Sequence, residues 1–339
     1  MLIYLSYMKH YNIPIFIPQL ACKNQCIYCN QRHISGQITI PSKEEIINKI
    51  ELHLKTFQKP YHAELAFFGG SFTAIGLEKQ RYYLEIIQPY IESNQIESIR
   101  ISTRPDCIRQ ETLDLLKRYN VKTIELGAQS LSQEVLDYSQ RGHTVEDIED
   151  ASRLINQNGF NLGLQMMIGL PKDTIEKSIH TANQIVSLGA KCTRIYPTLV
   201  IDNTELAEQY RQKEYKPLQL EEAIDWTSKI YQIFYENKIN ILRVGLHPSE
   251  ALISHKELLS GAFHVSFRQL VLTKIWHKKL QPLLWQTSNQ LTLFVHPQSL
   301  NSAIGYNSTN RNQLKRHHKH ILFKPDSSLR EFQYKYEII

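Results

Sequence analysis

Three cysteines lie within eight residues near the start of the chain, and this cluster constrains the protein more than any other feature. Cys22, Cys26 and Cys29 form a C-x3-C-x2-C pattern within "ACKNQCIYCNQRH". A disulfide uses two cysteines, and a structural zinc site or an ordinary iron–sulfur cluster uses four ligands. Three thiolates can hold three irons of a [4Fe–4S] cube and leave the fourth iron free to bind a small molecule. The pattern therefore predicts a metal centre with one open coordination position.

An alternative interpretation uses His33 as a fourth ligand, because the spacing then becomes C-x3-C-x2-C-x3-H. Such a zinc knuckle would make the chain a zinc-dependent nucleic-acid-binding protein without redox chemistry. The two remaining cysteines, Cys107 and Cys192, stand apart and are expected to be small buried residues. This bunching is unlike the dispersed, even set of a secreted disulfide protein and indicates a reducing compartment, the cytoplasm.

Short apolar runs rich in β-branched residues alternate with longer amphipathic runs. The pattern predicts strands at 13–20, 63–69, 98–103, 122–127, 161–168, 193–199 and 240–246. It predicts helices at 42–57, 77–93, 109–119, 131–139, 144–158, 173–188 and 219–237. Ser42 with Glu45, and Thr144 with Asp147, have the spacing of a capping box at a helix start.

This alternation predicts an α/β fold in which a parallel sheet is connected by crossover helices. Six such units form a partial (β/α)6 barrel of TIM type, whose chemistry lies at the carboxyl ends of the strands. After about residue 250 the pattern changes to a helix (265–279), a strand (291–296), a basic stretch (311–324) and a final alternating strand. We therefore expect a barrel over 1–250 and a small C-terminal α+β domain over 251–339.

Composition supports a globular protein that does not enter a membrane. Of the 339 residues 42% are apolar and 21% are charged, and the net charge is +6. No apolar run approaches the roughly 20 residues that span a bilayer, and the first residues lack the features of a signal peptide. The mildly basic charge is compatible with a polyanionic partner.

The cysteine loop after the first predicted strand resembles the signature of the radical S-adenosylmethionine (SAM) superfamily. The resemblance implies that Cys22, Cys26 and Cys29 hold a [4Fe–4S] cluster whose open iron binds SAM. Reductive cleavage of SAM would then give a 5′-deoxyadenosyl radical that abstracts hydrogen from a substrate. The resemblance further implies a low-potential electron donor of the flavodoxin or ferredoxin type. The cofactor would carry the difficult chemistry, and no side chain is assigned as a general acid or base.

The motifs "AFFGGSFT", "STRPD", "ELGAQS" and "LQMMIGLP" each lie at the end of a predicted strand, and "QRGHT" lies at the entry to the helix predicted at 144–158. The resemblance implies a role for three of these loops. The loop after the second strand binds the SAM amino group, and the loop after the third strand faces the SAM ribose and carboxylate. The loop after the fifth strand lies at the SAM adenine. The SAM pocket is thus predicted to contain Tyr28, Gly69, Gly70, Ser71, Thr103, Arg104, Gln129, Arg141, Gln165 and Ile168.

In this order the motifs resemble the radical SAM half of the catalytic subunit of Elongator, which modifies tRNA. The spacing of the first two cysteines is shorter here, and we expect no acetyltransferase domain, so the acetyl-CoA reaction is not carried over. RNA is the first substrate hypothesis. The alternative is a small molecule, such as a tetrapyrrole in a coproporphyrinogen dehydrogenase-like reaction.

The C-terminal basic stretch offers one clue to the substrate. It could contact phosphates with stacking by Phe323 and Tyr306, or it could be a solvated helix face and strand edge. Its charged and imidazole side chains are Arg311, Lys315, Arg316, His317, His318, Lys319, His320 and Lys324.

Overall fold

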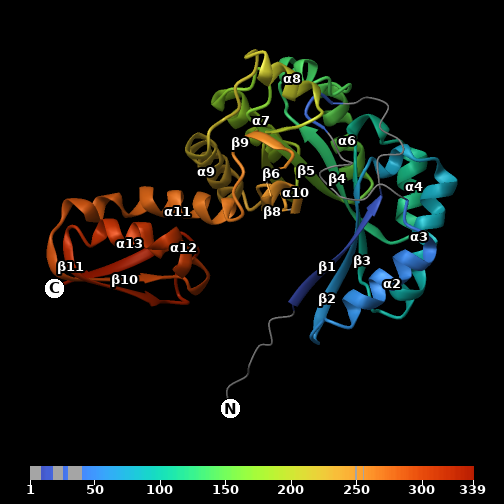
Figure 1. Cartoon of the computed structure of the whole chain (residues 1–339). Coiled ribbons are helices and arrows are strands. Elements are labelled where there is room, and N and C mark those ends of the chain that lie inside the picture. Colours follow the sequence, from blue (N-terminus) through green and yellow to red (C-terminus); the bar gives the residue numbers. More distant parts are fainter. Residues whose placement is uncertain (1–8, 18–25, 30–39, 249, 255) are drawn as a thin grey trace.

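A curled, open sheet of seven parallel strands forms the larger part of the protein (Figure 1). The computed structural model describes residues 9–17, 26–29, 40–248, 250–254 and 256–339. The strands, in spatial as in chain order, are β1 (Lys9–Ile17), β2 (Tyr61–Gly69), β3 (Ser98–Thr103), β4 (Val121–Gln129), β5 (Asn161–Ile168), β6 (Cys192–Pro197) and β8 (Asn240–Val244). Because β1 and β8 are the two edges and do not pair, the barrel is incomplete, as predicted.

Each strand buries one row of side chains against the helices and turns the other row toward the concave face. In β3, Ile99 and Ile101 are fully buried, whereas Arg100 and Ser102, which alternate with them, are partly exposed. This alternation follows from the two-residue period of a strand. The strand sequences therefore predict a polar concave face.

Helices connect the strands and cover the convex face of the sheet (Figure 1). They are α2 (Lys43–Leu54), α3 (Leu77–Glu92), α4 (Gln110–Arg118), α5 (Gln133–Tyr138), α6 (Val145–Gln157), α7 (Ile175–Ser187), α8 (Glu205–Arg211) and α9 (Leu220–Glu236). Both predicted capping boxes are present, at Ser42 with Glu45 and at Thr144 with Asp147.

The structure differs from the predictions at the end of β6 and in having one additional helix. The strand predicted at 193–199 ends at Pro197, and a separate strand β7 (Leu199–Ile201) begins two residues later. Between them the amide and hydroxyl of Thr198 both donate to the Ile168 carbonyl, which ends the regular ladder. Helix α8 was not predicted, because seven residues are too few for the helical periodicity of apolar side chains to be recognised.

The C-terminal region forms a second, smaller sheet of three strands in the order β11–β10–β12. Its elements are α11 (Phe267–Leu280), β10 (Ser288–Val295), α12 (Leu300–Ile304), α13 (Thr309–Leu314), β11 (His318–Pro325) and β12 (Tyr334–Ile338). Strand β10 runs parallel to β11 and antiparallel to β12. Figure 1 shows this module beside the large sheet, joined to it through α11, which packs on α9.

The predicted α+β character of this module is confirmed, but the final strand is shorter than predicted. The chain turns before Tyr334, where Phe332 is buried with a left-handed backbone angle φ of 59°. The boundary at residue 250 stays a prediction, because α10 (Glu250–Ile253) and β9 (Leu258–Gly261) lie between the two sheets, and β9 pairs with β7.

Candidate functional site

The carboxyl ends of four consecutive strands bring four of the predicted site residues to one edge. Gly69, Thr103, Gln129 and Ile168 are the last residues of β2, β3, β4 and β5. Neighbouring parallel strands end at the same edge of a sheet, so residues 26 to 39 positions apart in sequence become neighbours. The predicted pocket is thus a continuous rim.

Two of the three clustered cysteines lie in the described segment 26–29, which hydrogen bonds hold beside this rim. The Cys29 amide donates to the Cys26 carbonyl (3.0 Å), closing a tight turn. The Ile27 amide donates to the Ser139 carbonyl (3.3 Å), and the Ile27 carbonyl accepts from Leu206 (2.9 Å). Cys22, together with His33 of the zinc alternative, lies outside the described residues.

Arg141 connects the cysteine turn to the sheet. Its guanidinium donates to the Cys26 sulfur (3.2 Å) and to the Gly127 carbonyl (2.8 Å). A methyl group on Gly127 would come within 2.8 Å of this guanidinium, so the contact requires glycine. Arg141 therefore places a positive charge directly beside the Cys26 sulfur.

Gly69 and Gly70 hold the end of β2 against the end of β1. Gly69 has φ = +108°, and a Cβ there would approach the Ile17 carbonyl oxygen to 2.4 Å. The Gly70 amide donates to the same carbonyl (2.8 Å), and Ser71 beyond it is buried. Only glycine allows this backbone angle and this close approach, so the predicted loop has a definite structural cause.

Arg104 is buried with part of its guanidinium unused. It is 3% exposed, and it donates to both carboxylate oxygens of Asp106 (2.9 and 3.2 Å). Its third nitrogen, Nη1, is buried and has no hydrogen-bond partner among the described residues. A buried, unpartnered donor is costly unless something accepts from it, so Arg104 is suited to an anionic ligand group.

His143 lies buried near the two site arginines. Burial, together with the charges of Arg141 and Arg104, lowers the pKa of His143 to about 3. The imidazole is therefore neutral at physiological pH, and it adds no third cation to this part of the site.

Two glutamines meet at the centre of the rim. The Gln165 amide donates to the Gln129 side-chain oxygen (3.1 Å). Gln129 has a left-handed φ of 68° at a register shift between β4 and β5. Such a conformation is rare for a residue other than glycine and is typically found where function fixes the backbone.

Two other predicted residues already have partners. The Thr103 hydroxyl pairs with the Thr73 hydroxyl (2.6 Å), and the Ile168 carbonyl accepts two bonds from Thr198. Their predicted contacts to SAM stay predictions, and in this structure both hold the rim together.

A charged network lies below the rim on the concave face. Glu125 is 4% exposed and accepts from Arg194 (2.5 and 3.1 Å) and Arg100 (2.8 Å), and Arg100 also reaches Glu64 (2.7 Å). Burial alone would raise the pKa of Glu125, but Arg194 and Arg100 lower it. A buried carboxylate needs hydrogen-bond partners, and the two arginines supply them.

Arg100 and Arg194 were not predicted as site residues, although they occupy alternate polar positions in otherwise apolar strands. Gly163 makes room for the network, because a Cβ there would lie 2.8 Å from Glu125 Cγ and 3.0 Å from Cys192 Sγ.

The residues present fit the cofactors that the sequence predicted. Thiolates are the ligands of iron–sulfur clusters, and Cys26 and Cys29 share one turn beside a cation. The unpartnered Arg104 nitrogen and the glycine loop offer donors and space for the polar end of a bound molecule.

Comparison with known proteins decides the family. A model described as "Radical SAM superfamily" matches residues 16–185, half of the chain. This chain belongs to the radical SAM superfamily. A model of the radical SAM C-terminal domain matches residues 190–277. The family uses SAM and a [4Fe–4S] cluster, so the chain is an enzyme with these cofactors.

Several relatives are similar over part of the chain. An uncharacterized protein of Methanocaldococcus jannaschii is 31% identical over 62% of this chain and 67% of its own length. The tRNA uridine(34) acetyltransferase of the same organism is 31% identical over 48% of this chain. Human Elongator complex protein 3 is 26% identical over 63% of it. The matches span only 34% and 46% of those two longer relatives.

A solved structure supports the fold. The archaeal Methanocaldococcus infernus Elp3 lacking its N-terminus superposes with a TM-score of 0.66 at 22% identity, over 80% of this chain and 64% of the other. This likeness confirms the partial-barrel architecture. No helix in the part of the chain that the structure describes combines the length and the apolarity needed to cross a lipid bilayer.

Proposed function

We propose that this chain cleaves SAM at a [4Fe–4S] cluster held by Cys22, Cys26 and Cys29, and that its substrate is RNA. When bound and reduced, the cluster would supply the electron that cleaves SAM, and the 5′-deoxyadenosyl group released from SAM would take a hydrogen atom from the substrate. The observation that carries the proposal is the cysteine turn at the carboxyl rim, with Arg141 donating to the Cys26 sulfur at 3.2 Å.

The protein's own residues would bind and orient the cofactors. Arg141 balances negative charge at the sulfurs. Arg104 would donate a hydrogen bond to the SAM carboxylate from Nη1, which has no partner among the described residues. Gly69, Gly70 and Ser71 would surround the SAM amino group. The remaining predicted residues are Tyr28, Thr103, Gln129, Gln165 and Ile168, of which Gln129 and Gln165 already lie in contact.

RNA is favoured as substrate by two independent facts. Two of the similar proteins are named as tRNA uridine(34) acetyltransferases of Methanocaldococcus species. The chain carries a net charge of +6, the sign that attracts a polyanion. A low-potential electron donor, of the flavodoxin or ferredoxin type, is a further proposed partner. A reducing cytoplasmic compartment would suit the thiolate ligands.

The test begins with anaerobic reconstitution with iron and sulfide. The reduced protein is incubated with SAM, with and without total tRNA, and 5′-deoxyadenosine is measured by mass spectrometry. We expect brown, iron-containing protein and product formation. Cys26→Ala should lose both iron and product, because two thiolates cannot hold the cluster.

Cys192→Ala is the matched control, because Cys192 is the first residue of β6, at the opposite end of that strand from the carboxyl rim. It should keep iron and product. Folded protein that binds one zinc per chain, stays colourless and forms no 5′-deoxyadenosine would refute the proposal. Product formed without stimulation by tRNA, but with stimulation by a small-molecule extract, would refute the RNA part alone.

A further inference from the structure

Positive charge is concentrated in the C-terminal module. Residues 251–339 contain twelve Lys and Arg against four Asp and Glu, a net charge of +8. Residues 1–250 contain 27 Lys and Arg against 29 Asp and Glu, a net charge of −2. The basic character of the chain is therefore a property of the module, and the barrel is close to neutral.

One end of the module also exposes a large aromatic ring. Trp285 is 87% exposed, the highest value among the large apolar side chains that the structure describes. It ends a 3₁₀ turn (Gln281–Trp285) between α11 and β10. A tryptophan side chain left in water costs solvation free energy that a partner would recover.

Hydrogen bonds tie this turn to the basic stretch. The Ser288 amide donates to the His317 carbonyl (3.2 Å). The buried His318 donates from Nε2 to the Leu283 carbonyl (2.9 Å), so its Nδ1 accepts from the Ser288 hydroxyl (2.7 Å). Trp285 is therefore held at the same end of the module as the residues that precede β11.

The cations at this end are exposed and have no acidic partner within the described ranges of the chain. Lys315, Arg316 and Lys319 are exposed, and none of them forms an ion pair with any described residue. By contrast, Lys278 in the last turn of α11 pairs with Asp225 (2.9 Å). Unpaired cations around an exposed ring are the elements of a single-strand binding surface.

The aromatic residues predicted from the sequence for this role are placed elsewhere. Phe323 is partly buried against the core, and Tyr306 packs edge-on against His264 (5.5 Å). His318 of the basic stretch is 1% exposed and structural. Trp285, 26 residues before the first cation of the stretch in sequence, takes their place because the fold brings it there.

We propose that Trp285, Lys315, Arg316 and Lys319 form a docking surface for an unpaired segment of RNA. A base stacks on the indole ring, and the cations contact the flanking phosphates. This inference rests on RNA being the substrate, and it names the surface that holds it. The positive charges favour a polyanionic partner. The exposed planar ring favours RNA over an acidic protein, because a base can stack on it.

The test measures binding of a fluorescein-labelled oligouridylate to the reconstituted enzyme by anisotropy, over a range of salt concentrations. Trp285→Ala should weaken binding about five- to a hundredfold, the range for loss of one base–aromatic stack. Lys315→Glu with Arg316→Glu should lower the slope of log affinity against log salt by about 1.4, the loss of two phosphate contacts.

A second readout uses the tryptophans as probes. Trp276 is fully buried and Trp226 partly buried, so RNA should quench mainly the emission of Trp285. The quench should disappear in Trp285→Phe, which retains a ring for stacking. Because Trp285 is exposed, neither substitution should affect folding.

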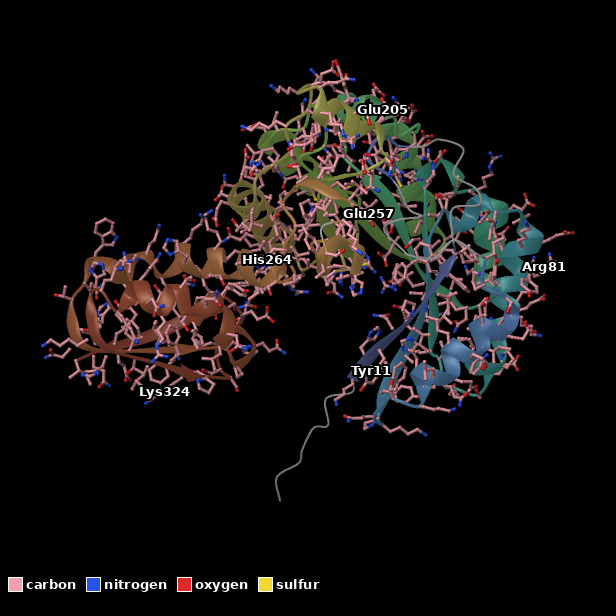
Figure 2. The ribbon with its side chains drawn as sticks, in the orientation of Figure 1. Tyr11, Arg81, Glu205, Glu257, His264 and Lys324 are labelled. Carbon is pink, nitrogen blue, oxygen red and sulfur yellow. The ribbon has the colours of Figure 1, made fainter. Side chains whose placement is uncertain are left out.

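The control is Lys79→Glu with Arg81→Glu on α3, two exposed cations on the barrel. Figure 2 places Arg81 on the far side of the molecule from Lys324 of the module. This variant should bind RNA as the wild type does. Unchanged affinity and salt slope in the Trp285 and Lys315/Arg316 variants would overturn the inference. RNA-independent SAM cleavage, assayed on the same preparations, tests the proposed chemistry separately, since none of these residues lies at the rim.

Discussion

Replacing His143 by glutamine should remove a specific part of the acid sensitivity of this protein. His143 is 4% exposed and its pKa is lowered to about 3. In the unfolded chain its pKa is about 6.5. Acid therefore protonates the unfolded state first, and stability that is complete above pH 6.5 is lost as the pH falls toward 3.

The magnitude follows from these two pKa values. At pH 7 the unfolded chain carries little charge on this histidine, and the linkage contributes only about 0.2 kcal/mol. At pH 5 the unfolded histidine is almost fully protonated and the native one is not, which corresponds to about 2 kcal/mol. The wild type should thus lose about 2 kcal/mol more than His143→Gln between pH 7 and pH 5.

Urea denaturation of both proteins at the two pH values, followed by circular dichroism, measures this difference. Other groups cancel in the comparison. Asp173, for example, has a pKa raised to about 6 by burial and titrates in both proteins. Equal pH dependence in the two proteins would refute the reasoning, and it would mean that His143 is solvated or charged between the arginines.

Two further substitutions test the rim and the network below it. Gly69→Ala should abolish cluster binding and destabilise the fold, because φ is +108° and the Ile17 carbonyl lies 2.4 Å from the new Cβ. Iron content and thermal unfolding measure this, and Gly76→Ala, which meets nothing within 4 Å, is the control. Wild-type iron content in Gly69→Ala would contradict the prediction. Glu125→Gln should lower the free energy of unfolding by about 3–5 kcal/mol, because it leaves Arg100 and Arg194 buried with weakened partners. The control Asp150→Asn breaks only an exposed pair with Arg153 and should change little. A loss below about 1 kcal/mol in Glu125→Gln would show that water replaces the carboxylate.

Local patterns predicted most of the fold. The seven strands of the large sheet, the capping boxes at Ser42 and Thr144, and the glycine loop at Gly69 follow from periodicity and from conformational limits that act over a few residues. The two misses have different causes, one local and one non-local. Helix α8 is too short to show a period, and β6 ends early because Thr198 bonds to another strand.

The sequence by itself determined the chemistry, because the spacing of Cys22, Cys26 and Cys29 and the order of the strand-end motifs need no coordinates. The tertiary structure decided which side chains act together. Arg141 reaches Cys26 across 115 positions, Arg194 reaches Glu125 across 69, and Trp285 joins the basic stretch rather than Tyr306. Such partners depend on which strands become neighbours. Contacts that close long loops cannot be predicted from the periodicity of a short segment, because that periodicity reports only on nearby residues.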